Sequence, residues 1–126
     1  MQEIIVVGVG GFVGAVARYL LSSLIHRNLD SNFPWGTFTV NVVGCFLIGC
    51  LMYLIEHRLI VSDQMRLFLG IGILGAFTTF ATFSQEIISL MRSGQNWIAL
   101  ANVLLSVSLG IMALWAGYLL LKRVGA

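Results

Sequence analysis

Two phenylalanines beside a threonine-rich segment could act on small ions. Phe80 and Phe83 are three residues apart, so a helix would present both rings on one face. An aromatic ring has a negative face and a positive edge, and ring edges that point into a narrow passage could attract a small anion. Such attraction is weaker than that of a full positive charge, and conduction requires binding weak enough for release. Ordinary packing of two rings in an apolar helix is the alternative interpretation.

The segment before these rings could supply oxygen ligands to a cation. Three glycines, Gly70, Gly72 and Gly75, lead into Thr78 and Thr79 in the middle of an apolar stretch. A run of this composition can unwind and free its backbone carbonyls, which are suitable ligands for an alkali cation. A broken helix survives in a membrane only where protein or a cavity satisfies the exposed groups. We therefore expect a helix that is broken near its middle.

Three other polar residues lie deep in apolar stretches, where lipid cannot satisfy their hydrogen-bonding groups. Asn41 must face another helix or a water-filled path, and its amide could donate to an anion. Arg18 either anchors at the interface by snorkelling or attracts anions in a vestibule. Glu86 needs a partner, for which we expect a structural pair, with proton carriage as the alternative.

Four apolar stretches must position these residues. The chain has 126 residues, of which 59% are apolar and 10% charged, whereas soluble domains are about 25% charged. The stretches cover residues 4–25, 36–55, 65–91 and 97–121, each near the roughly 20 residues that cross a bilayer as a helix. Lipid offers no partner to a free backbone group, so each stretch must be helical. We predict one all-α transmembrane domain, residues 1–126, with four spans.

Small residues mark the helix faces on which these spans would pack. Gly10 and Gly14 are four residues apart, so a neighbouring backbone can come close to the first span. In the fourth span, small and polar residues form one helical stripe, for which a packing face is the default and a pore wall the alternative. The stripe consists of Asn102, Ser106, Gly110, Ala113 and Gly117.

Several other classes of protein and site find little support. Cys45 and Cys50 point in different directions on a helix, and no Cys/His set has zinc spacing. A net charge of +2 is too small and scattered to suggest nucleic acid. The sequence offers no nucleophile–base pair that could support enzymatic catalysis. Ala15 and Ala17 resemble a signal-peptide cleavage site, but the preceding segment holds Glu3 and no Lys or Arg. We expect a retained span.

The charges flanking the spans give only a faint orientation signal. Four spans place both termini on one side, and that side would hold Arg58, Arg66, Lys122 and Arg123. The other side would hold Arg27 and Arg92, with Arg18 if it snorkels that way. Positive charge favours the cytoplasmic side. A difference this small leaves open a single orientation with the termini inside or insertion in both orientations.

The third stretch also resembles a known family. Gly75 to Ser84 is similar to the Gly-Gly-x-Thr-Thr-Phe-Ser-Thr-Phe-Ser core of the Fluc/CrcB fluoride channels. Further matches to the family's first and second helices are Gly10, Gly11, Gly14, Ala17, Arg18, Gly36, Thr37, Val40, Asn41 and Gly44. The resemblance covers essentially the whole chain. Ala76 and Ala81 depart from the family's usual glycine and serine, so any role of that serine does not carry over.

The resemblance implies a function that composition did not show. Members are antiparallel, dual-topology homodimers with two narrow pores, and they are not enzymes. Fluoride leaves passively across the cytoplasmic (inner) membrane, which gives fluoride resistance. The resemblance implies a multi-pass protein of that membrane. Its outer face would contact the lipid bilayer, and the chain would be inserted in both orientations.

The resemblance also assigns roles to individual residues. Those in contact with fluoride would be Asn41, Thr79, Phe80 and Phe83, with Ser106 and Ser108 as candidate hydroxyls of the fourth helix. Gly75 and Thr78 of both subunits would give backbone carbonyls to a central structural sodium ion, and Arg18 would attract anions in a vestibule.

Three competing functions remain to be separated from a fluoride channel. A small multidrug or metabolite antiporter needs a carboxylate in the middle of its first span, where this chain has none. A fluoride/proton exchanger would use Glu86. A scaffold subunit without transport is disfavoured by the polar groups at membrane depth in three spans.

Overall fold

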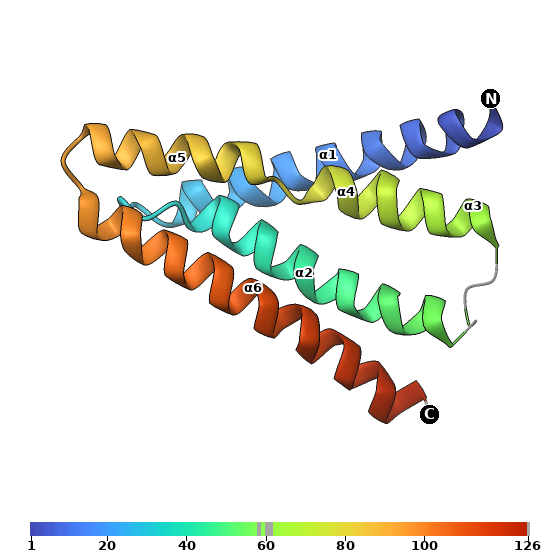
Figure 1. Cartoon of the computed structure of the whole chain (residues 1–126). Helices are drawn as coiled ribbons and strands as arrows, with labels where there is room; N and C mark the ends of the chain where they lie inside the picture. Colours follow the sequence, from blue (N-terminus) through green and yellow to red (C-terminus); the bar gives the residue numbers. More distant parts are fainter. Residues whose placement is uncertain (58, 60–61, 126) are drawn as a thin grey trace.

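Long helices make up the computed structural model, which describes residues 1–57, 59 and 62–125. Every element in this part of the chain is helical, and both termini lie at the same end of the molecule (Figure 1). Four helical stretches are long and apolar enough to cross a membrane: Gln2–Asn28, Trp35–Glu56, Asp63–Arg92 and Asn96–Gly125. The prediction of an all-α, multi-pass membrane protein is confirmed. Arg58, one of the charges in the orientation argument, lies outside the described residues.

Three of these stretches are single helices. They are α1 (Gln2–Asn28), α2 (Trp35–Glu56) and α6 (Asn96–Gly125). The third stretch is composite and consists of α3 (Asp63–Arg66), the π-helix η1 (Leu67–Leu74), α4 (Gly75–Phe77) and α5 (Phe80–Arg92). Between α4 and α5, Thr78 and Thr79 have extended backbones, with φ/ψ of −85°/155° and −150°/121°.

The glycine run itself does not unwind, so that part of the sequence interpretation is wrong. Gly70 and Gly72 lie within η1, and Gly75 is the first residue of α4. The wide turns of η1 were not predicted. In a π-helix each backbone hydrogen bond joins residues five positions apart rather than four, and such segments inside α-helices often lie at functional sites. Gly72 serves close packing instead, since a Cβ there would lie 2.9 Å from Cα of Gly10. The residues that leave helical geometry are the two threonines that follow the glycines.

Close backbone contact between α1 and η1 explains Gly10 and Gly14 of the first span. A Cβ added to Gly10 would lie 2.6 Å from the carbonyl oxygen of Phe68 and 3.0 Å from Cα of Gly72. A Cβ on Gly14 would overlap the carbonyl group of Ile73. The packing role predicted for Gly10 and Gly14 is confirmed, because only hydrogen leaves room for the neighbouring backbone.

The same device joins α2 to α6. A Cβ on Gly49 would overlap the carbonyl oxygen of Leu114, and a Cβ on Gly117 would overlap that of Phe46. Asn102 and Gly110, from the same stripe of α6, are buried as well. The stripe is therefore a packing face against α2 along much of its length.

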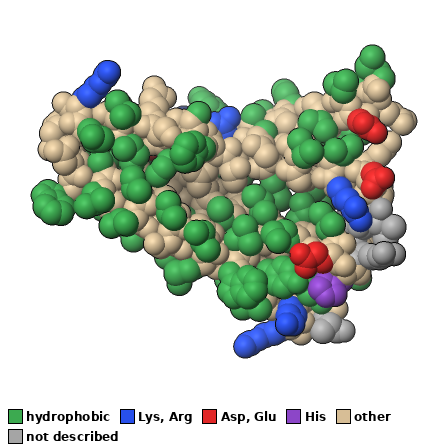
Figure 2. All heavy atoms as spheres, viewed as in Figure 1, with side chains coloured by type: hydrophobic (Ala, Val, Ile, Leu, Met, Phe, Trp, Pro, Cys, Tyr) green, Lys and Arg blue, Asp and Glu red, His purple; other side chains and the backbone are tan. Residues whose placement is uncertain are grey.

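Apolar side chains cover the outside of the molecule. Phe12 is 72% exposed, and Trp97 and Ile111 are exposed to a similar degree. In Figure 2 hydrophobic side chains spread across the face in view, and most of the charged side chains lie toward its ends. A water-soluble protein rarely exposes so large an apolar surface. This surface suits lipid as the surrounding solvent.

We expect Gly14→Ala to destabilise the fold by about 1–3 kcal/mol, because the new methyl group forces apart two backbones that cannot repack separately. The measurement is thermal or denaturant unfolding of the purified chain in detergent. Gly11→Ala is the matched control, since a Cβ there would meet nothing within 4 Å. Equal stability of the two variants would contradict the packing argument.

Candidate functional site

Asn41 holds the extended segment between α4 and α5 in place. Its side-chain Nδ2 donates to the carbonyl oxygen of Thr79 at 2.9 Å, and its Oδ1 accepts from the Thr79 N–H at 2.8 Å. The amide thus replaces the neighbour that a helix would give to both backbone groups of Thr79. An extended residue in the middle of a span needs such a partner, because lipid provides none.

The hydroxyl of Thr79 caps the start of α5. Thr79 Oγ1 accepts from the backbone N–H of Thr82 at 3.2 Å and donates to Thr82 Oγ1 at 3.3 Å. A threonine with extended backbone angles is a favoured N-cap, because its oxygen satisfies one of the free N–H groups of the first turn. Phe80 is consequently the first residue of α5, directly after the extended segment.

Arg18 binds the other side of the interruption. Its Nε donates to the carbonyl oxygen of Ala76 at 3.0 Å, near the end of α4. A cation at the C-terminal end of a helix satisfies a free carbonyl and complements the helix dipole. Arg18 is therefore held by α4 and does not simply snorkel along α1 to the interface. Its attraction for anions stays a prediction.

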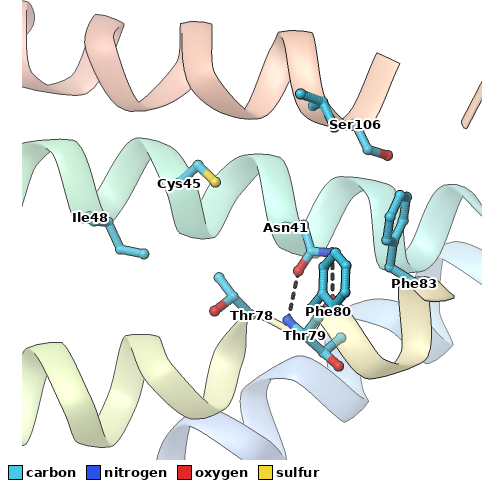
Figure 3. A pocket seen from close by; sticks show the side chains of 9 residues that line it. Asn41, Cys45, Ile48, Thr78, Thr79, Phe80, Phe83 and Ser106 are labelled. Carbon is cyan, nitrogen blue, oxygen red and sulfur yellow. Dashed lines mark hydrogen bonds between the residues drawn. The ribbon is translucent and has the colours of Figure 1, made fainter. Parts of the chain in front are cut away.

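A pocket of about 270 Å³ opens beside the interruption. Its lining residues come from α2, the extended segment, α5 and α6, and are Asn41, Cys45, Ile48, Thr78, Thr79, Phe80, Phe83, Ser106 and Val107. Figure 3 shows Asn41 reaching from α2 to Thr79, with the two phenyl rings beside this contact and Ser106 on the neighbouring helix. None of these lining residues carries a charged side chain.

The two rings form the aromatic part of the pocket. Their centroids are 5.7 Å apart, and their planes are inclined by 45°. Phe80 is 78% exposed, so its ring projects outward, whereas Phe83 is half-buried. Inclined rings present edge hydrogens as well as faces, and the edges carry partial positive charge. The pocket therefore combines weakly positive ring edges with the amide of Asn41.

The structure brings together five of the six residues predicted to contact the ion. Asn41, Thr79, Phe80, Phe83 and Ser106 line the pocket. Ser106 donates to the side-chain oxygen of Asn102 at 2.8 Å, which holds its hydroxyl on this face of α6.

Other predicted site residues lie apart from this pocket. Ser108 is exposed and is not among the lining residues, since two positions along a helix point to different faces. Gly75 and Arg18 also lie outside the lining, whereas Thr78 belongs to it.

Three of the lining residues were not predicted from the sequence. Cys45 and Ile48 follow Asn41 at spacings of four and seven residues on α2. That spacing places them on one helical face and was the signal that could have found them. Val107 follows Ser106 directly, and nothing in its type or spacing marks it.

Glu86 has the polar partner that its depth in the third span required. Its Oε1 accepts a hydrogen bond from the Thr37 hydroxyl. Glu86 is not among the residues that line the pocket with the two rings. The carboxylate is thus paired structurally with α2, apart from the aromatic pocket.

Comparison with known families identifies the chain. A family model described as CrcB-like protein, Camphor Resistance (CrcB), matches residues 5–118. The chain belongs to the CrcB-like family. This membership agrees with the third-span motif, in which the threonines and phenylalanines of the family core occupy the interruption and the start of α5.

Curated relatives of this CrcB-like chain carry the name fluoride-specific ion channel FluC. The relative from Magnetococcus marinus is 47% identical over 92% of this chain and 94% of its own length. Those from Rhizobium meliloti and Solibacter usitatus are 43% and 46% identical, over 98% and 97% of this chain and 99% and 100% of their own lengths. These proteins are named as channels and not as enzymes.

We expect Asn41→Leu to lower the stability of this CrcB-like chain by about 1–3 kcal/mol. Leucine keeps the volume of the side chain but leaves both backbone groups of Thr79 without their partner. The measurement is unfolding in detergent. Asn28→Leu is the control, because Asn28 is exposed and donates to Leu24 of its own helix. A loss no larger than that of the control would show that Asn41 does not hold the segment.

Proposed function

We propose that this CrcB-like chain forms a fluoride-selective channel. It would let fluoride leave passively across the cytoplasmic membrane and so give fluoride resistance. The observation that carries the proposal is the pocket in which Asn41, Thr79 and the rings of Phe80 and Phe83 meet. Relatives 43–47% identical over nearly the whole chain are named fluoride-specific ion channels, which supports the same function.

The chemistry of the pocket suits a small, strongly hydrated anion. An ion that enters must exchange water for other donors, and a narrow site favours the smallest ion that its donors can surround. Asn41 has a second N–H besides the one bound to Thr79, and the ring edges of Phe80 and Phe83 add weak positive charge. Because no lining residue carries a full charge, the ion would be held loosely enough to move on.

The exposed ring of Phe80 supports an assembly of two chains. A single chain leaves this ring 78% exposed beside a pocket that is open on one side. A second copy in antiparallel orientation would cover the ring and close the passage, and two symmetry-related passages would result. The faint difference in flanking charge supports insertion in both orientations, because neither orientation is strongly favoured.

The interruption also supports a structural sodium ion between the two chains. In a continuous helix the Thr79 N–H would donate to the Gly75 carbonyl, but here it donates to Asn41. The Thr82 N–H, the helical donor to Thr78, likewise donates to the Thr79 hydroxyl. The carbonyls of Gly75 and Thr78 would then be available as ligands, and two copies related by a twofold axis would double their number. Carbonyl oxygens are suitable ligands for an alkali cation. Anomalous scattering from thallium(I) exchanged for sodium tests this site.

An exchanger that uses Glu86 has less support than a channel. The carboxylate accepts from Thr37 and lies outside the lining of the aromatic pocket. Coupled exchange needs a proton carrier in the path of the ion. The arrangement of the described residues therefore favours passive flux.

Liposomes that contain the purified chain should release fluoride and retain chloride. We expect Phe80→Ile to slow fluoride release by roughly tenfold or more, because an aliphatic side chain has no positive edge to offer the ion. The measurement is efflux recorded with a fluoride electrode, beside a chloride electrode.

Phe12→Ile is the matched control for this variant. Phe12 is an exposed phenylalanine of α1 that is not part of the pocket lining. The control should release fluoride at the wild-type rate. Release that is unaffected by Phe80→Ile, or equal release of chloride, would contradict the proposed channel.

Labelling in membranes tests the orientation of the chains. In a variant with Cys45→Ser, Cys50→Ser and Asn28→Cys, a membrane-impermeant maleimide should label about half of the molecules in sealed vesicles, because an antiparallel pair inserts equally both ways. The rest should react once detergent opens the vesicles. Labelling of all or none of the molecules before detergent is added would rule out equal insertion.

A further inference from the structure

A second cavity of about 270 Å³ lies near the turn between α5 and α6. It is separate from the aromatic pocket, with which it shares no lining residue. The lining residues are Asn32, Pro34, Glu86, Ser89, Leu90, Ser93 and Gln95. They come from the connection between α1 and α2, from α5 and from the turn. Five of them carry side-chain oxygens.

Two buried oxygens among the lining residues have no partner. Glu86 Oε2 and Gln95 Oε1 are inaccessible and accept no hydrogen bond from the described part of the chain. The other oxygen of Glu86 accepts from Thr37. A buried carboxylate oxygen without a partner is costly, and proteins ordinarily satisfy such groups.

A chain of hydrogen bonds orients the Gln95 amide. Its Nε2 donates to Ser93 Oγ at 3.0 Å, and Ser93 Oγ donates to the carbonyl of Leu90 at 3.0 Å. The backbone N–H of Gln95 donates to the same carbonyl at 2.8 Å, and Gly94 makes the turn with φ of 79°. The amide nitrogen is thus engaged within the turn, and the amide oxygen is left free.

Both unpartnered groups are acceptors, so the cavity has the opposite chemistry from the aromatic pocket. An anion would be repelled by the Glu86 carboxylate and would find no free donor in these two groups. A cation in the cavity that both residues line would satisfy these oxygens once the two side chains turn toward it, and the hydroxyls of Ser89 and Ser93 and the amide of Asn32 could add further oxygens. Hard oxygen ligands of this kind suit alkali and alkaline-earth ions.

We propose that this cavity binds a hard monovalent cation of the size of sodium through the Glu86 carboxylate and the Gln95 amide oxygen. A single carboxylate matches one positive charge, whereas divalent sites ordinarily recruit more carboxylates or substrate phosphates. Water completes the coordination, since the cavity is larger than one ion. The site differs in place and in ligands from the sodium site proposed at Gly75 and Thr78, and it does not depend on the proposed transport of fluoride.

Anomalous diffraction from thallium(I) tests the proposal on the full-length chain. Crystals grown in sodium nitrate and soaked in thallium(I) nitrate at pH 8 should show an anomalous peak between Glu86 and Gln95. His26 is the nearby basic side chain that acts on Glu86, and an alkaline pH lowers the competition of protons with the added ion. Excess sodium should displace the thallium. A cavity filled by water alone would give no peak, which would overturn the proposal.

Variants separate this site from any other cation site. Glu86→Gln keeps the shape of the side chain but removes its charge, so the peak in this cavity should disappear while a peak at Gly75 and Thr78 should remain. Gln95→Leu should abolish or strongly reduce the same peak. Asp63→Asn is the control, because it removes an exposed carboxylate near Arg66, outside the cavity. A peak that survives both cavity variants would overturn the assignment of these ligands.

Thermal unfolding in detergent provides a second measurement that needs no crystals. Sodium should raise the melting temperature relative to N-methylglucamine at equal ionic strength, because the ion binds only the folded chain. In Glu86→Gln, sodium should bind this cavity more weakly. The sodium concentration that gives half of the cavity's contribution to the rise in melting temperature should therefore be higher by roughly tenfold or more. Asp63→Asn should respond as the wild type does. Identical sodium responses of the wild type and Glu86→Gln would contradict the proposal.

Discussion

The structure depends on how two extended residues are satisfied inside a membrane span. Thr78 and Thr79 leave helical geometry where lipid offers no hydrogen bonds, so side chains must replace the missing helical neighbours. Asn41 supplies both a donor and an acceptor from α2, Arg18 supplies a donor from α1, and the Thr79 hydroxyl caps α5. Each of these polar residues would be costly in lipid alone. Their presence has one common reason, because each of them satisfies backbone groups that the interruption exposes.

This set of contacts requires helices that lie unusually close together. Gly10 and Gly14 bring the backbone of α1 against η1, so the short distance from Arg18 to the end of α4 can be spanned by one side chain. On the other side, Gly49 and Gly117 join α2 to α6, which places Ser106 across from Asn41. Small residues thus act at a distance from the pocket: they set the helix spacing that its polar contacts need.

Much of this arrangement could be predicted from the sequence, and the exceptions have physical reasons. The spans followed from apolar length, and the contact of Asn41 with another helix followed from an amide that lipid cannot satisfy. Its meeting with Phe80 and Phe83 was implied only by the resemblance to the Fluc/CrcB family. The π-helix was not predictable, because its glycines equally suit unwinding or close packing. The partner of Arg18 depends on helix spacing, which local patterns do not give. The orphan oxygen of Gln95 depends on the conformation of a turn.

The reciprocal bond between Asn41 and Thr79 has a mechanical consequence. Since Phe80 directly follows Thr79, the first ring is attached to α2 through a single amide as well as to its own helix. A thinner or thicker bilayer changes the tilt of its spanning helices to match their apolar length. Any such tilt of α2 would pull on the base of the ring. The lipid composition of the host membrane would then act on the position of the Phe80 ring beside the pocket.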